Sequence, residues 1–295
     1  MAKLTEYTSL EEKQQFYGDN CYNVIDTTSQ LQTELGALLK TKHLLFRGMN
    51  EAKYKLFTSG QREYIHHEYT KAGIRYHDFM QSLLDNVDAD IDLKEYNRTV
   101  NIKTNDSYYF TYLQHYGAYS PYIDYSTDLH MALFFSILDM HQQPSDRDID
   151  NYFSLYYIAQ SDIPFIRDIY KALFLGMNAD SRGISLDLNV LLEMRLFYVS
   201  WEKHYGKFGN HYFLYRMPNR NMLAQKGVLI FNASDSKPLE EVDILKGKIH
   251  CMDIHKSLWQ KMQAMYLQGV TKDRLFPCEY HVAKQAYVKF QKEFI

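Results

Sequence analysis

The sequence predicts an α+β protein with a mixed, mostly antiparallel sheet flanked by helices. Short apolar or aromatic strand candidates alternate with helix candidates along the chain. They lack the repeating strand–helix unit of a doubly wound sheet, and no internal repeat is present. Because 295 residues are many for one core and few for two, we expect one large domain with a helical appendage.

Residues 1–40 are predicted to form the helical appendage, and residues 41–295 the main domain. Two pairs have the spacing of a helix capping box, namely Ser9 with Glu12 and Thr27 with Gln30. After the second pair, leucines recur at helical spacing between residues 31 and 39. The appendage is therefore expected to contain two helices.

Strands and helices of the main domain follow from apolar periodicity and from turn residues. The predicted strands are 43–48, 122–125, 152–158, 195–200, 227–231 and 248–254. The predicted helices are 61–84, 106–116, 128–138, 256–267 and 279–290. Polar composition favours exposed loops at 88–104 and 141–150.

Composition narrows the classes of function. The net charge of -3, with both signs interspersed, lacks the basic footprint of a dedicated nucleic-acid binder, although a local basic cleft is compatible with it. The first residues have no apolar region like that of a signal peptide, and the longest apolar run, 131–138, is too short for a bilayer. Three widely spaced cysteines indicate reduced thiols. A cytoplasmic protein without a membrane partner is expected.

Standard catalytic signatures are absent from the sequence, including glycine-rich nucleotide loops and paired metal motifs. His204 and His211 lie seven residues apart, and Cys278 with His281 could meet Cys251 or His250 in space. Zinc sites usually have tighter paired spacing, so we expect no metal.

Two segments carry candidate site residues. In Phe46-Arg47-Gly48 an arginine ends an apolar strand, either as a surface residue or as a guanidinium aimed into a cleft to bind phosphate. His115 and Asp124 lie in a polar turn between two apolar helices. On one interpretation each of them caps a helix or is a hydrogen-bonded residue of the core. On the other, each is a residue of a functional site.

These segments and two later ones resemble, in order, the FRG domain, which is named after its Phe-Arg-Gly motif. Tyr54-x-Leu56 and Arg62 are similar to the next element of the family. The later matches are Gln114-His115-Tyr116-Gly117, Ile123-Asp124-Tyr125-Ser126, Ala132-Leu133-Phe134-Phe135, Asn219-Arg220, Ala224-Gln225 with Gly227, and Leu275-Phe276-Pro277. The chain departs from the pattern at Ser120-Pro121, where the family has Thr-Arg, and at Tyr125, where it has tryptophan.

The order of motifs is also similar, more distantly, to ADP-ribosyltransferases. That resemblance implies an ADP-ribosyltransferase-like core and NAD as substrate. It assigns cofactor binding to Arg47, Gly48, Arg62, Tyr125 and Ser126, with Arg47 at the pyrophosphate or ribose. The implied catalytic residues are His115 as acid or base, Asp124 at the nicotinamide ribose and Gln225 near the ribose hydroxyls.

The implied chemistry is cleavage of the nicotinamide glycosidic bond, by an ADP-ribosyltransferase or an NAD glycohydrolase. Its oxocarbenium-like transition state needs a nearby negative charge. Gln225-Lys226-Gly227 offers none where transferases have a glutamate, and Asp124 is the best replacement, with Glu279 second. The alternative is a non-catalytic module that senses a nucleotide or binds a protein. The family occurs in bacteria and phages, which implies a toxin or an anti-phage defence effector, with a protein or nucleic-acid acceptor left open.

Overall fold

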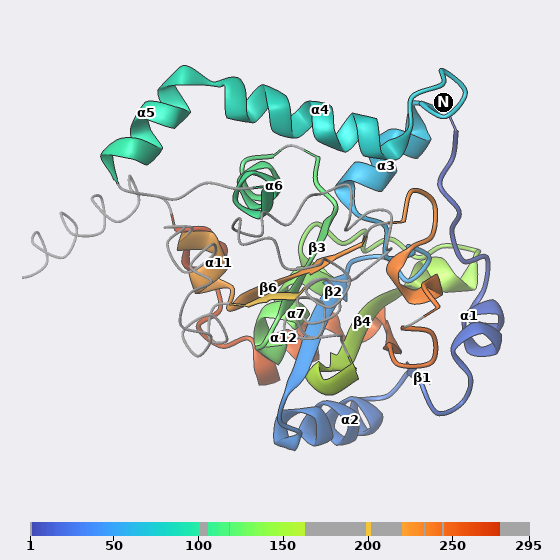
Figure 1. Ribbon diagram of the computed structural model, residues 1–295. Helices are drawn as coiled ribbons and strands as arrows, with labels where there is room; N and C mark the ends of the chain where they lie inside the picture. Colours follow the sequence, from blue (N-terminus) through green and yellow to red (C-terminus); the bar gives the residue numbers. More distant parts are fainter. Residues whose placement is uncertain are drawn as a thin grey trace, which may run out of the picture.

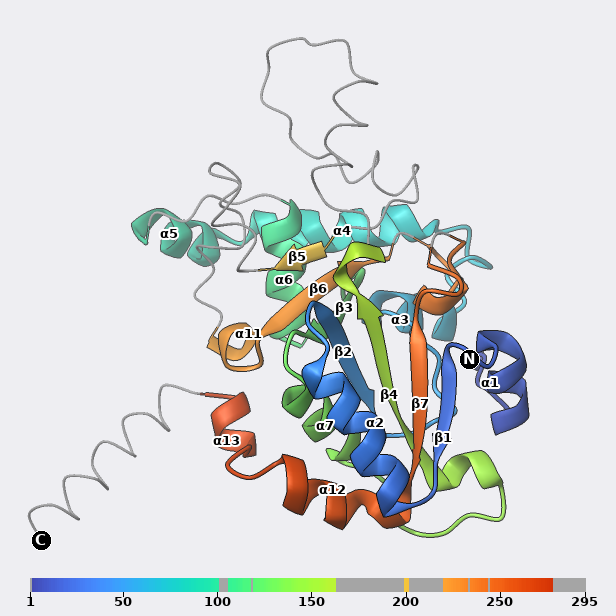
Figure 2. The ribbon, with the colours of Figure 1, turned by 90° about the horizontal axis from the view of Figure 1, so that it is seen from below.

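The computed structural model describes residues 2–100, 106–117, 119–162, 199–201, 220–232, 234–243 and 245–277. Within them the chain forms a seven-stranded sheet in the order β1-β7-β4-β2-β3-β6-β5 (Figures 1 and 2). The strands are β1 (Tyr22–Ile25), β2 (Leu44–Met49), β3 (Tyr122–Ser126), β4 (Tyr152–Ala159), β5 (Val199–Trp201), β6 (Gly227–Phe231) and β7 (His250–His255).

The sheet is mixed and mostly antiparallel, which confirms the predicted α+β class. Strands β1 and β7 pair in parallel at one edge. The pairs β7–β4, β4–β2, β2–β3, β3–β6 and β6–β5 are antiparallel. Neighbours in the sheet are mostly distant in the chain, so the fold depends on long-range pairing rather than on hairpins.

Helices cover both faces of the sheet. They are α1 (Leu10–Tyr17), α2 (Thr28–Lys40), α3 (Ser59–His66), α4 (Tyr76–Ala89), α5 (Ile91–Thr99), α6 (Asp106–His115), α7 (Leu129–Ile137), α11 (Arg220–Ala224), α12 (Trp259–Tyr266) and α13 (Lys272–Leu275). Short 3-10 turns lie at Asp148–Asn151, Gln160–Asp162, Leu239–Glu241 and Lys256–Leu258. In Figure 2, α2 lies across the strands on one face, α12 lies by the lower ends of the strands, and α1 lies beside β1 at the edge.

Successive side chains of the central strands β2 and β4 point to opposite faces of the sheet, so each face has its own hydrophobic cluster. Phe46 of β2 and Leu155 of β4 pack with α2, α7 and α12 on one face. Their neighbours Leu45 and Tyr156 pack on the other face, in a tyrosine-rich cluster that includes Tyr7 and Tyr17 from the N-terminal segment. A third cluster joins α3, α4 and α6 to β3 and β6. The period of two in each strand thus assigns each side chain to its layer.

Both predicted capping pairs begin helices. Thr27 and Gln30 form a complete capping box at α2. Ser9 caps α1, but the Glu12 carboxylate accepts from Thr8 N rather than from Ser9 N. Strand β1 lies between these helices, within the segment for which only helices were predicted. It was missed because four residues are too few to show a period.

Two predictions about the following helices were wrong. The single helix predicted at 61–84 is two helices, α3 and α4, separated by a turn in which Gly73 adopts φ +76°. The loop predicted at 88–104 contains helix α5, which begins where Asp90 accepts a hydrogen bond from Leu93 N. Helix α5 buries only Asn97, so its sequence shows no apolar stripe.

The remaining predicted elements that fall on described residues lie within a few residues of the observed ones, whereas the short helices α11 and α13 were not predicted. Of the strand predicted at 195–200, Val199 and Ser200 belong to β5, and the rest lies outside the described residues. The helix predicted at 279–290 also lies outside them. Across the described part of the chain, no helix is long and apolar enough to cross a membrane.

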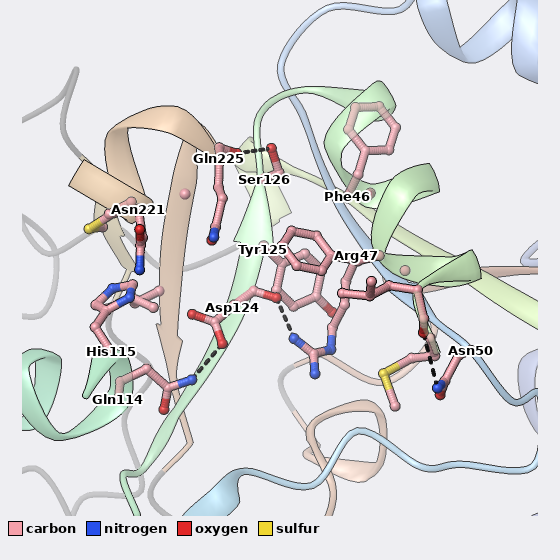
Figure 3. Close-up of a pocket in the computed structure, with 18 of the residues that line it drawn as sticks. Phe46, Arg47, Asn50, Gln114, His115, Asp124, Tyr125, Ser126, Asn221 and Gln225 are labelled. Carbon is pink, nitrogen blue, oxygen red and sulfur yellow. Dashed lines mark hydrogen bonds between the residues drawn. The ribbon is translucent and has the colours of Figure 1, made fainter. Parts of the chain in front are cut away.

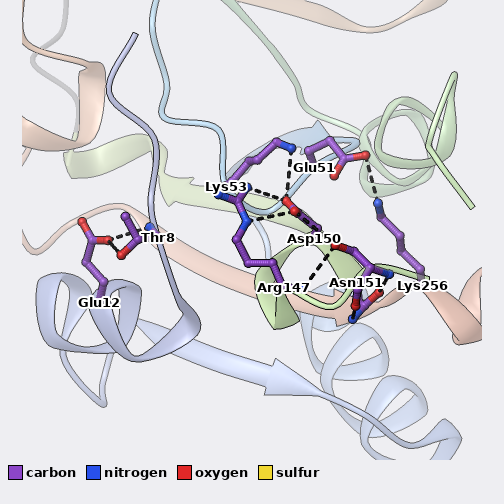
Figure 4. A network of polar contacts seen from close by, with 9 residues as sticks. Thr8, Glu12, Glu51, Lys53, Arg147, Asp150, Asn151 and Lys256 are labelled. Carbon is purple, nitrogen blue, oxygen red and sulfur yellow. Dashed lines mark hydrogen bonds and ion pairs between the residues drawn. The ribbon is translucent and has the colours of Figure 1, made fainter. Parts of the chain in front are cut away.

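Polar contacts fix the loop that precedes β4 (Figure 4). The Asp150 carboxylate accepts from Lys53 at 3.1 Å and from Arg147 at 2.7 Å, and these partners hold its pKa well below the usual range. Nearby, Lys256 and Glu51 form an ion pair of 2.9 Å that is almost fully buried. The segment that follows β2 is thereby held against β4 and β7.

Candidate functional site

The sheet opens between β2 and β3. These strands share a single register pair, Phe46 with Ser126, and diverge beyond it. Arg47 follows on one strand and Tyr125 on the other, and the Arg47 Nη1 donates across the gap to the Asp124 carbonyl at 2.6 Å. The opening creates a pocket at the centre of the sheet, walled by α3, α6, α7 and α11.

The pocket has a volume of about 410 Å³, in the range of small-molecule sites. Figure 3 shows it with the side chains that line it. Its lining includes eight of the residues that the sequence proposed for catalysis or cofactor binding, namely Arg47, Gly48, Arg62, His115, Asp124, Tyr125, Ser126 and Gln225. Glu279, the second candidate for the missing carboxylate, lies outside the described residues. The structure brings these eight residues together from β2, α3, α6, β3 and the turn that follows α11. Their individual roles stay predictions.

Two guanidinium groups face this pocket. Arg47 Nε is buried and has no hydrogen-bond partner among the described residues. Arg62 is solvent-exposed at the mouth, yet the surrounding protein and then the charge of Arg47 lower its pKa to about 10, so it stays protonated at neutral pH. Neither arginine forms an ion pair within the described part of the chain. Two adjacent cations without a counter-ion are suited to an anionic ligand.

The Asp124 carboxylate is held by a short relay of hydrogen bonds. Gln114 Nε2 donates to Asp124 Oδ2, and Gln114 Oε1 accepts from Ser120 Oγ. Because the Ser120 hydroxyl itself accepts from Tyr122 N at 3.1 Å, its proton is directed toward Gln114. The relay therefore fixes the orientation of the Gln114 amide and, through it, one oxygen of Asp124.

His115 projects from the last turn of α6 on the same side of the pocket as Asp124 (Figure 3). Its Nε2 is buried, and none of the described residues bonds to it. Burial lowers the pKa of His115 from its ordinary value, although the charge of Asp124 acts in the opposite direction. The imidazole is therefore neutral at pH 7 and able to accept a proton.

Gly48 has a packing role that the sequence did not reveal. A Cβ at this position would lie 1.9 Å from the Ala132 carbonyl oxygen and 2.5 Å from Ser136 N. Strand β2 and helix α7 approach so closely that only glycine fits between them. The glycine of the Phe-Arg-Gly motif thus seats α7 against the strand that carries Arg47, besides lining the pocket.

Ser126 and Gln225 are engaged in structural contacts. Ser126 Oγ donates to the Gln225 carbonyl at 2.7 Å and accepts from Asp128 N at 3.0 Å. Gln225 Nε2 donates to the Leu275 carbonyl at 3.0 Å, which ties α13 to the pocket wall. In contrast, the buried Tyr125 hydroxyl has no described partner, and burial raises its pKa.

Several lining residues were absent from the predicted site. Gln114 directly precedes His115 and could have been found from that position, since α6 ends at the pocket. Tyr54 and Asn50 follow β2 in an irregular segment that gives no periodic signal. The apolar lining includes Phe135, Met222 and Phe276. In the sequence, nothing distinguishes these residues from ordinary core residues.

No group of three or more metal-ligating side chains gathers within the described residues. His204, His211, Cys278 and His281, which were weighed as ligands, lie outside them. Cys251 is described, and it is a buried free thiol.

Residues 42–145 match the family model of the FRG domain. The resemblance to the FRG domain is therefore confirmed over these residues, and the chain contains an FRG domain. The more distant similarity to ADP-ribosyltransferases stays a prediction. The match spans β2 to α7 and includes the predicted site residues from Arg47 to Ser126, while Gln225 lies beyond it. Neither a curated protein nor a solved structure matches the chain.

Proposed function

We propose that this FRG protein binds NAD in the pocket between β2 and β3 and cleaves its nicotinamide glycosidic bond. The observation that carries the proposal is the juxtaposition of Arg47 and Arg62, which lack ion-pair partners among the described residues, with Asp124 and His115 in one pocket. The guanidinium groups match a pyrophosphate, and the carboxylate and imidazole suit chemistry at a sugar carbon.

In the proposed reaction, water attacks C1′ of the nicotinamide ribose. The glycosidic bond breaks, and its electron pair leaves with nicotinamide, which becomes neutral. His115, neutral at pH 7, accepts the proton of the attacking water, and Asp124 stabilises positive charge on the sugar. The products are ADP-ribose, nicotinamide and a proton; an ADP-ribosyltransferase would use a protein or nucleic-acid nucleophile in place of water.

The second candidate function is a non-catalytic module that senses a nucleotide. The position of Gln225 favours it, because its amide donates to the Leu275 carbonyl and supplies no carboxylate to the pocket. Under either function, consumption or sensing of NAD is consistent with a cytoplasmic toxin or anti-phage defence effector, which is the biological role we propose.

Release of nicotinamide from NAD, followed by proton NMR, tests the enzyme proposal. We expect His115→Ala and Asp124→Asn to lower the rate by about 100-fold or more while NAD affinity is retained. Asp243→Asn, at an exposed position away from the pocket, should leave the rate unchanged. Since His115 works as a base in its neutral form, turnover should be maximal at pH 7 and decline only below its ordinary pKa of 6.5. Absence of turnover, together with NAD binding that either substitution weakens, would favour the sensing module instead.

A further inference from the structure

A smaller pocket adjoins the main one. It has a volume of about 90 Å³ and is bordered by the N-terminal residues Leu4 to Glu6 and by Tyr54, Lys55 and Phe57. Tyr54 and Arg62 line both pockets. The two cavities therefore meet at one aromatic ring and one guanidinium group.

Backbone hydrogen bonds hold the N-terminal segment, which forms one wall of the small pocket. Glu6 forms an antiparallel bridge with Tyr54, and Tyr7 N donates to the Lys53 carbonyl at 2.9 Å. The next side chain, Tyr7, is buried in the tyrosine-rich core. A ligand in the small pocket would thus meet a surface that is ordered before binding.

Three ionisable side chains line the small pocket, namely Glu6, Lys55 and Arg62. Lys55 is paired with Glu241 at 2.7 Å, so its charge is already balanced. Glu6 disfavours an anion beside the N-terminal segment, which leaves the position of Arg62, at the border with the main pocket, for an anionic group. Arg62 has no ion pair among the described residues, and it stands where the two pockets meet. An anionic group held there would have space for a ring on either side, and Tyr54 and Phe57 offer aromatic surface to a base.

We propose that the small pocket receives the adenine of a dinucleotide whose pyrophosphate lies at Arg62 and Arg47. This inference rests on the proposed function for the main pocket, where the nicotinamide ribose would lie. It adds that the N-terminal segment is part of the ligand site and that the adenine half of the ligand lies in a separate, smaller pocket.

Titration calorimetry with ADP-ribose and with nicotinamide mononucleotide tests the proposal, because neither compound contains the complete NAD substrate. Thr5 is exposed and borders the small pocket, so Thr5→Trp should fill it without disturbing the fold. Lys3→Trp places the same side chain at an exposed position outside the pocket lining. Tyr54→Leu removes the shared ring as a second, independent change.

We expect Thr5→Trp and Tyr54→Leu each to weaken ADP-ribose binding by about tenfold, and Lys3→Trp to leave it unchanged. Nicotinamide mononucleotide, which would occupy only the main pocket, should bind Thr5→Trp as it binds the wild type. Equal ADP-ribose affinity in wild type and Thr5→Trp would overturn the inference, as would absence of ADP-ribose binding. A tenfold loss in a protein that releases no nicotinamide would support the dinucleotide site while refuting the proposed cleavage.

Discussion

Two groups of buried polar side chains lie on this sheet, and they differ in how completely they are bonded. Lys13 and Asp253, both fully buried, form an ion pair of 2.7 Å between α1 and β7. Lys13 Nζ also donates to the Ala52 carbonyl and to Ser154, and Asp253 accepts from Tyr22 as well. Each donor of the ammonium group is thus matched.

The pocket between β2 and β3 is the opposite case. Arg47 Nε, His115 Nε2 and the Tyr125 hydroxyl are all buried, and none of them has a hydrogen-bond partner among the described residues. Buried polar groups are costly when they lack a hydrogen-bond partner. Tyr76, His77 and Asn97 also have such atoms, but these three residues do not line the pocket. The bonded network therefore supports the structure, and the three unbonded groups gathered in the pocket are the ones that the proposed ligand would contact.

The largest effect is expected at the bonded network. Lys13→Met leaves the Asp253 carboxylate buried without its cation, and we predict a loss of about 3–5 kcal/mol in the free energy of unfolding, measured by urea denaturation. The double variant Lys13→Met/Asp253→Leu should recover part of this loss, because no buried charge is then left without its counter-ion. Recovery stays incomplete because the hydroxyl groups of Tyr22 and Ser154 lose their acceptor. A loss below about 1 kcal/mol for Lys13→Met, the scale of an exposed pair, would contradict the structural role.

Glu240 is intermediate in bonding between the Lys13–Asp253 network and the pocket groups. It is buried and hydrogen-bonded but has no ion-pair partner in the described structure. It accepts from Tyr7 and from Leu56 N, and burial raises its pKa from 4.5 to about 7. The folded protein therefore binds this proton more tightly than the unfolded chain does. The contribution of Glu240 to stability is therefore greatest below pH 4.5, falls as the pH rises toward 7 and is level above that.

Glu240→Gln should remove this part of the pH dependence. We expect the variant to exceed the wild type by about 2 kcal/mol in unfolding free energy at pH 8 and to match it near pH 4. Unfolding curves of both proteins across this range supply the measurement. A variant less stable than the wild type at pH 8 would show that the charge of Glu240 is favourable where it lies.

The sequence predicted much of the fold because local signals carried it. The spacing of Thr27 and Gln30 favours a helix start, and the aromatic residues of β4 are typical of a strand. Helix α5 escaped prediction because an exposed helix needs no apolar stripe, and β1 because its place depends on β7, far along the chain.

The candidate site was predicted from ordered motifs, and the structure gathers those residues in one pocket. What the sequence could not supply was the bonding state of each group. Ser126 and Gln225 appear in motifs like the others, yet their side chains bond to backbone carbonyls of the protein itself. Similarly, the close approach of α7 that requires Gly48 arises only from tertiary packing.

The most direct test of this account is the matched substitution in the pocket, Arg47→Met, measured for both unfolding and ADP-ribose binding. We predict an unfolding free energy within about 1 kcal/mol of the wild type, because Arg47 forms only one described hydrogen bond. We also predict a loss of ADP-ribose affinity of about tenfold or more, since a charge-assisted contact with the pyrophosphate disappears. Unchanged affinity, combined with a loss of stability like that of Lys13→Met, would contradict the account by showing that Arg47 supports the fold and not a ligand.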